Sequence, residues 1–368
     1  MAFSFTYLFA ILNLMQKIIS LSDLSSLTYK TYRKYFKKMS AVLGVIFLVT
    51  VIPVVFQGLV ETDFDLVLGW LQNIFGSNLG ITAVIFIAVL VLLAYLGLLF
   101  VNILLSIGFV QKTADIKNQS FKTKDVFLAG KSLIKPTIWL SIKTFVFSLA
   151  VLAMIGIPFI LLTVALVPFA PPLFVLIVIG LLGLVALIAL AFASIHIAFS
   201  QFALYIDGKK ELEAIEHSVE IVQGNIWNII SKATVYYIVF FVAFVLGVLA
   251  LGFIQDIILR SVYGIADTQA MNQLYELRVT GVIVGEMIVT AIVNLVNVFV
   301  VFPVTMIASI ILYRSLQDTH IAQLEDETVI RKRELKTFIP RLYRIGKWTL
   351  LALVLLPLFA LLFMSLFS

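Results

Sequence analysis

The sequence predicts an all-α membrane protein, a polytopic transmembrane helix bundle of about seven spans with amphipathic interfacial helices on its cytoplasmic side. Hydrophobic residues make up 62% of the 368 positions and charged residues 12%. A soluble domain has about 45–50% apolar and about 25% charged residues. A lysine-bearing helical stretch also leads into a pair of long apolar runs three times, near Leu24, Val126 and Leu212. This pattern predicts three repeated helix-plus-hairpin units.

The predicted spans are apolar runs that approach or exceed the roughly 20 residues a helix needs to cross hydrocarbon. In order, they are Met39–Val60, about 81–107, the two halves of Thr144–Ile206, Ala233–Gln255, Thr280–Tyr313 and Trp348–Ser368. The run from Thr144 to Ile206 is too long for one span. Three prolines between Pro168 and Pro172 predict a tight reversal that divides it, since proline lacks a backbone donor and cannot continue a helix.

These runs divide the chain into four predicted regions. They are N-terminal interfacial helices at 1–38, a six-span membrane domain at 39–313, a basic cytoplasmic segment at 314–347 and a seventh helix at 348–368. The six-span domain comprises hairpins at 39–111, 137–206 and 233–313. Residues 1–19 have no basic residue ahead of their apolar part, so they do not fit a signal peptide. We interpret them as an interfacial or partly inserted helix, with an eighth span as the alternative.

Basic residues predict the orientation of the chain. Of the 26 lysines and arginines, all but Arg260 and Arg278 lie on one side of the predicted spans. Short cytoplasmic loops carry such an excess of positive charge. We therefore expect a multi-pass protein of the cytoplasmic membrane, with the N-terminus in the cytoplasm and, given seven spans, the C-terminus outside.

The stretches before the hairpins have one apolar and one charged face. In the third, Leu212, Ile215, Val219, Val222 and Ile226 recur at helical spacing, and Gln223–Asn225 is expected to end the helix. In the first, basic side chains surround the apolar face. We take four of these as candidate contacts to anionic lipid, namely Arg33, Lys34, Lys37 and Lys38, at about 1 kcal/mol each. The alternative is that they only set topology.

Polar residues within the sixth run form a second candidate site. Glu286, Thr290, Asn294 and Asn297 follow one another at steps of four, four and three residues, so they share one helical face. Ionisable and polar groups inside a membrane often line a cavity or pathway. The alternative is that the asparagines bond neighbouring helices and that Glu286 reaches interfacial water or pairs with an arginine. Pro303 is expected to kink this helix.

Two segments resemble a known family. They are Asp23–Phe36, and Phe202–Gly208 followed by Ala214, Ser218 and Gly224–Trp227. They resemble bacterial integral membrane proteins grouped with the membrane domain of glycerophosphoryl diester phosphodiesterases, over about residues 20–315. Most members lack an assigned function, and some are fused to a soluble phosphodiesterase domain. This chain has no room for that domain, and its histidines, His196, His217 and His320, lie on separate elements, so the activity is not carried over.

The motifs expected of an enzyme are missing. The sequence has no phosphate-binding loop, nucleophile elbow or zinc-protease motif, and the absence of cysteine excludes thiolate chemistry. We expect no catalytic residue, cofactor or metal. The expected partners are membrane lipids and a protein on the cytoplasmic face, but no nucleic acid. The leading hypothesis is a non-catalytic protein of envelope or lipid organisation or partner scaffolding. The alternatives are a transporter or channel for a lipid or small solute and an enzyme acting on lipid head groups.

Overall fold

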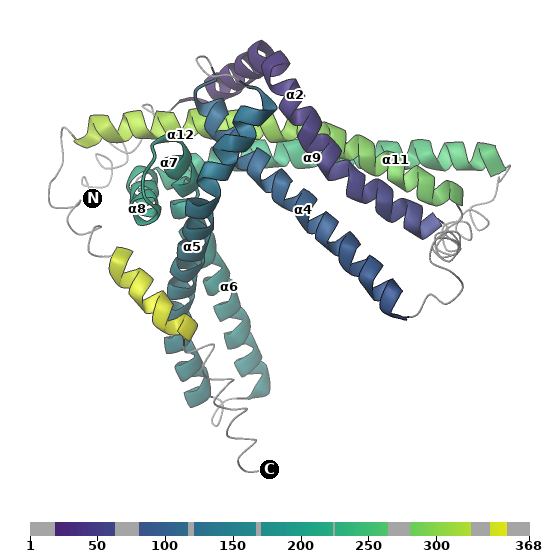
Figure 1. Cartoon of the computed structure of the whole chain (residues 1–368). Coiled ribbons are helices and arrows are strands. Elements are labelled where there is room, and N and C mark those ends of the chain that lie inside the picture. The colour runs from purple at the N-terminus through teal and green to yellow at the C-terminus, as the bar shows by residue number, and fades with distance from the viewer. Residues whose placement is uncertain are drawn as a thin grey trace. The chain divides into compact units, whose positions relative to one another are not determined.

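The computed structural model describes residues 19–62, 81–116, 121–166, 171–223, 225–263, 280–324 and 339–351. The described residues are almost all helical and include no β-strand. The helices are α2 (Leu21–Thr62), α4 (Ile81–Ala114), α5 (Thr123–Leu166), α6 (Pro172–Ile197), α7 (Ser200–Ile206), α8 (Glu211–Val222), α9 (Ile226–Tyr263), α11 (Thr280–Val296), the π-helical segment η1 (Asn297–Val301) and α12 (Phe302–Leu324), with a further helix at 339–351 (Figure 1).

Six of the helical stretches are long and apolar enough to cross a membrane. They are Leu21–Val55, Val89–Ala114, Thr123–Pro158, Leu176–Ile206, Val245–Val262 and Val284–Thr319. Each overlaps one of the first six predicted spans. The predicted proline reversal falls where α5 has ended and α6 begins, with Pro172 as the first residue of α6. The interpretation of residues 1–18 and most of the seventh span, 348–368, lie outside the described residues.

No break in the helix marks the boundary predicted between the first interfacial helix and its span, because α2 runs continuously through residues 38 and 39. Its buried face explains the continuity. Leu24, Thr28, Tyr35, Met39 and Val42 are buried and recur at steps of four, seven, four and three residues. One helical stripe therefore packs across the whole predicted boundary.

The second and last predicted boundaries likewise fall inside continuous helices. Helix α5 continues through Pro136 into its apolar part, and α12 continues past Arg314 to Leu324. Of the three predicted interfacial helices, α8 is the separate one. It is bounded by the turn at Gly208, which has a left-handed φ of 65°, and by Gln223. Its buried residues are Ala214, Ile215, Ser218, Ile221 and Val222, so the observed face is rotated from the predicted one.

The chain divides into two compact units. The first, here the α2 unit, consists of Leu21–Ser132 and Lys232–Ser309. The second, the α6 unit, consists of Met1–Ser20, Leu133–Ser231 and Ile310–Ser368. Helices α5, α9 and α12 contribute residues to both units.

Within the α2 unit, α4 and the start of α5 touch backbone to backbone. A Cβ added to Gly108 would overlap the carbonyl of Val126, and one added to Gly130 would overlap the carbonyl of Leu104. Each helix therefore supplies one glycine and one carbonyl to the crossing. Small residues allow such close approach between apolar helices, for which membrane lipid provides no hydrophobic driving force.

This crossing predicts that Gly108→Ala and Gly130→Ala each lower stability by about 1–3 kcal/mol, the usual cost of overpacking. Gly97→Ala in the same helix α4 is the matched control, because open space surrounds Gly97. The thermal unfolding midpoint of the purified protein in detergent measures the effect. Equal midpoints for the Gly97 and Gly108 variants would show that the backbone contact is not formed.

Candidate functional site

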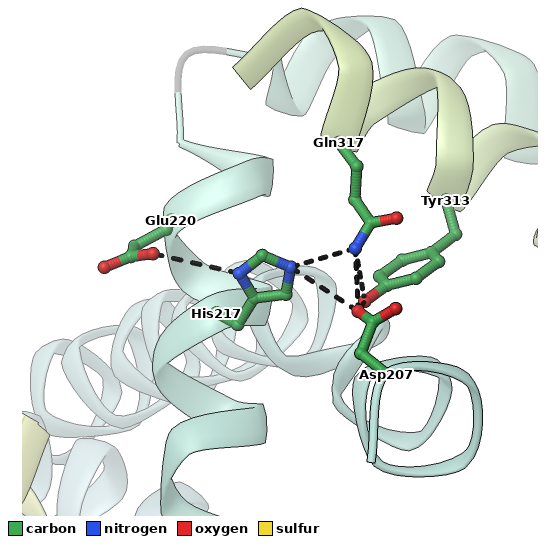
Figure 2. Close-up of polar contacts among 5 residues, drawn as sticks. All are labelled: Asp207, His217, Glu220, Tyr313 and Gln317. Atoms are coloured by element: carbon green, nitrogen blue, oxygen red, sulfur yellow. Dashed lines mark hydrogen bonds and ion pairs between the residues drawn. The ribbon is translucent and has the colours of Figure 1, made fainter. Parts of the chain in front are cut away.

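Five polar side chains far apart in the sequence meet in the α6 unit. These are Asp207, His217, Glu220, Tyr313 and Gln317, here called the His217 cluster (Figure 2). Asp207 follows α7, His217 and Glu220 lie on α8, and Tyr313 and Gln317 lie on α12. Asp207 directly follows one predicted apolar run and Tyr313 ends another, so the cluster joins the ends of two apolar segments.

Ser218 positions α8 beside the junction of α6 and α7. Its hydroxyl donates to the carbonyl of His196 at 2.6 Å and accepts from the backbone N–H of Phe199 at 3.1 Å. Both backbone groups lie at the junction of the two helices. At helix ends, backbone N–H and C=O groups lack an intrahelical hydrogen-bond partner. Because Ser218 is fully buried, these two bonds hold α8 against the junction.

The start of α8 is held by charge. Lys143 of α5 donates to Glu211 Oε2 at 3.0 Å. The hydrogen bond from Lys143 is the main reason that the pKa of Glu211 is lowered. A lowered folded-state pKa means that this pair stabilises the fold above the unfolded pKa of Glu211 and that the contribution is lost as the pH falls through the folded one.

Asp207 is the acceptor at the centre of the cluster. The hydroxyl of Tyr313 donates to Asp207 Oδ2, and Gln317 Nε2 donates to the same oxygen at 2.7 Å. Gln317 Nε2 also lies 3.1 Å from the Tyr313 oxygen. Tyr313 is fully buried and stacks on Phe199 and Phe202, each at 5.9 Å between ring centroids. Both donors to Asp207 therefore come from α12.

His217 lies between two carboxylates. Its Nε2 is 3.8 Å from Asp207 Oδ2, and its Nδ1 is 3.8 Å from Glu220 Oε2. The amide Nε2 of Gln317 approaches His217 Nε2 at 3.2 Å. An amide nitrogen donates and does not accept, so in this arrangement His217 Nε2 is the acceptor and the ring proton is on Nδ1. The carboxylates lie on opposite sides of the ring (Figure 2).

The chemistry available to this cluster is hydrogen bonding and proton binding. The described part of the chain contains no group of three or more histidine, cysteine, aspartate or glutamate side chains arranged to hold a metal ion. Its members are two carboxylates, an imidazole, a phenol and an amide, all within hydrogen-bonding or ion-pair distance of another member.

The predicted polar face of the sixth span is partly paired within its own helix. Asn294 donates to the backbone carbonyl of Thr290 at 3.0 Å, and both are half-buried. Glu286 and Asn297 are exposed. Asn297 begins the π-helical segment. In a π-helix the backbone hydrogen bonds join residues five positions apart, instead of four as in an α-helix.

Pro303 explains a contact at the π-helical segment. It has no N–H to offer the carbonyl of Phe299, its partner four residues earlier in an α-helix. Tyr32 of α2 fills this place by donating its hydroxyl to that carbonyl at 2.7 Å. The ring of Phe299 lies 6.4 Å from Phe36 and 6.1 Å from Phe47, on the same side of α2.

We expect Tyr32→Phe to destabilise the protein by about 1 kcal/mol, because it leaves a partly buried acceptor without its donor. Tyr29→Phe, at an exposed tyrosine of the same helix, is the control and should be neutral. Thermal unfolding in detergent provides the readout. If both variants unfold at the wild-type temperature, the hydroxyl contributes nothing at this carbonyl.

The basic residues predicted to meet lipid are all exposed on α2. Arg33, Lys34, Lys37 and Lys38 surround the buried Tyr35, whose ring centroid lies 5.4 Å from Lys34 Nζ and 5.5 Å from Lys38 Nζ. In the described residues none of the four forms an ion pair with an acidic side chain. They form an exposed cationic surface.

Two other candidates have structural partners. His196 Nδ1 lies 2.8 Å from the carbonyl of Phe192 in its own helix. Gly285 lies against the side chain of Gln255, which donates to the carbonyl of Val282 at 3.4 Å. Gly285 therefore makes room for a contact between α9 and α11 of one chain.

Comparison with known proteins finds no matching family model, no matching curated protein and no matching solved structure. The resemblance to membrane domains of glycerophosphoryl diester phosphodiesterases stays a prediction from the two sequence segments.

Proposed function

We propose that this chain is a non-catalytic integral protein of the bacterial cytoplasmic membrane that organises anionic lipid at the cytoplasmic surface. One observation carries the proposal. The four exposed cations of α2 lie on a helix that continues directly into an apolar span, so their height above that span is set by helix geometry.

Helix geometry gives that height. An α-helix rises about 1.5 Å per residue, and the headgroup layer extends about 5–8 Å beyond the hydrocarbon on each side. The apolar run begins at Met39. Lys37 and Lys38 would then lie within about 3 Å of the hydrocarbon along the helix axis, and Arg33 within about 9 Å. At these heights the four cations would lie in the headgroup layer or next to it, within reach of lipid phosphates.

Packing holds these cations away from the protein interior. Tyr35 and Met39 are buried in the α2 unit, whereas Arg33, Lys34, Lys37 and Lys38 are exposed. The helix therefore cannot turn its charged face inward without exposing its buried stripe. A fixed cationic surface within reach of lipid phosphates favours anionic lipid over zwitterionic lipid. A protein partner on the cytoplasmic face could use the same surface, and scaffolding belongs to this proposal.

A transporter or channel for a lipid or small solute is the second candidate. The observation that favours it is the π-helical segment at Asn297, at the end of the predicted polar face, because π segments occur frequently at functional sites.

We expect Lys34→Gln, Lys37→Gln and Lys38→Gln together to remove about 3 kcal/mol of anionic-lipid binding, on the order of a hundredfold. The purified protein is incubated with phosphatidylglycerol and phosphatidylcholine, and bound lipids are counted by native mass spectrometry. The wild type should retain phosphatidylglycerol preferentially, and the triple variant should lose that preference.

The matched control removes the same charge at three exposed lysines outside the Arg33–Lys38 segment. Lys30, Lys122 and Lys124 are exposed, and their replacement by glutamine should leave the preference intact. Equal losses in both triple variants would indicate non-specific charge attraction. No loss in the Lys34, Lys37 and Lys38 variant would refute lipid binding at this surface.

A further inference from the structure

Asp207 Oδ2 is shared among the helices that meet at the His217 cluster. It accepts from Tyr313 and from Gln317, both on α12, while His217 of α8 holds its Nε2 at 3.8 Å from the same oxygen (Figure 2). Two donors are bound and a third nitrogen is close. The protonation state of that nitrogen decides whether it can compete for the oxygen.

The neutral ring supports the contact with α12. With Nε2 unprotonated, Gln317 donates one amide hydrogen to Asp207 and directs the other toward His217. The amide then bridges the turn after α7 and helix α8. Gln317 therefore ties α12 to both elements as long as His217 Nε2 remains an acceptor.

A protonated ring reverses these preferences. The new N–H on Nε2 would face the N–H of Gln317 at 3.2 Å, donor against donor. The imidazolium would also lie between two carboxylates, Asp207 from the end of α7 and Glu220 from α8, each 3.8 Å away. The side chains that α12 presents to the ring, Tyr313 and Gln317, are uncharged. Opposite charges at such distances attract, which favours a bond from His217 to Asp207.

We propose that His217 is a proton-controlled latch for α12. The neutral ring keeps Gln317 on Asp207, and the protonated ring takes Asp207 Oδ2 from Gln317, so that α12 keeps only the Tyr313 bond. The proton comes from water and is returned to it, and no covalent bond changes except N–H. Histidine is the side chain that ordinarily changes charge near physiological pH, so acidification on this side of the protein would loosen α12. This inference does not depend on lipid binding.

The absence of cysteine in the chain makes a distance measurement direct, because two introduced cysteines are the only labelling sites. Spin labels at Lys210→Cys and Asp318→Cys, both at exposed positions near the cluster, report on α8 and α12. Electron–electron distance measurements on the full chain in nanodiscs at pH 8 and pH 5 should show a shift of about 2 Å or more, typical of helix displacements in switching proteins.

Two variants and one control decide the outcome. His217→Gln should remove the pH response, whereas His196→Gln, at a histidine bonded within its own helix, should retain it. Gln317→Met should give the acidic distance at both pH values, which provides a second test if His217→Gln does not fold. An unchanged wild-type distance, or a full response in His217→Gln, would overturn the proposal.

Discussion

The contact between Asp207 and the two donors of α12 is the interaction on which the α6 unit depends most. It joins the ends of two apolar segments at one point, and around it lie Ser218, the His217 ring and the Tyr313 aromatic stack. Apolar helices in a bilayer gain little from burying more apolar surface against each other, so their arrangement is set by close packing and polar bonds. A single carboxylate oxygen with two donors, one of them the buried Tyr313, supplies such a bond at a defined place.

In the α2 unit, the helices are held by close contact between their backbones. Gly108 and Gly130 bring two backbones together, and Pro303 leaves a carbonyl that Tyr32 satisfies. Each contact follows from what one residue lacks, a side chain in glycine and an N–H in proline. In α2, one continuous helix carries both the exposed cations Arg33, Lys34, Lys37 and Lys38 and the apolar residues that follow them.

Much of the fold could be predicted from the sequence because it depends on local composition. Charge-free runs predict the spans, and the Pro168–Pro172 cluster predicts the reversal before α6. The sequence predicts a boundary at residues 38 and 39 because the basic residues end there. The spacing of Leu24, Tyr35 and Met39, which are buried on one face of α2, is the signal for a continuous helix. The His217 cluster could not be predicted in this way. Asp207 and Tyr313 are 106 residues apart, and no periodicity links them. Pro303 predicts that the carbonyl of Phe299 lacks its usual helical donor, but no sequence pattern near Pro303 identifies Tyr32 as the replacement donor.

The central claim is that the Tyr313 hydroxyl and the Asp207 carboxylate act as one unit in holding α12. A double-mutant cycle of Asp207→Ala and Tyr313→Phe, followed by thermal unfolding of the full chain, measures their coupling directly, because each change removes one partner of the hydrogen bond. Hydrogen bonds to charged groups contribute about 1.5–3 kcal/mol, so we expect a coupling energy of that size and a double variant hardly less stable than either single one. Additive losses, with a coupling energy near zero, would contradict the account.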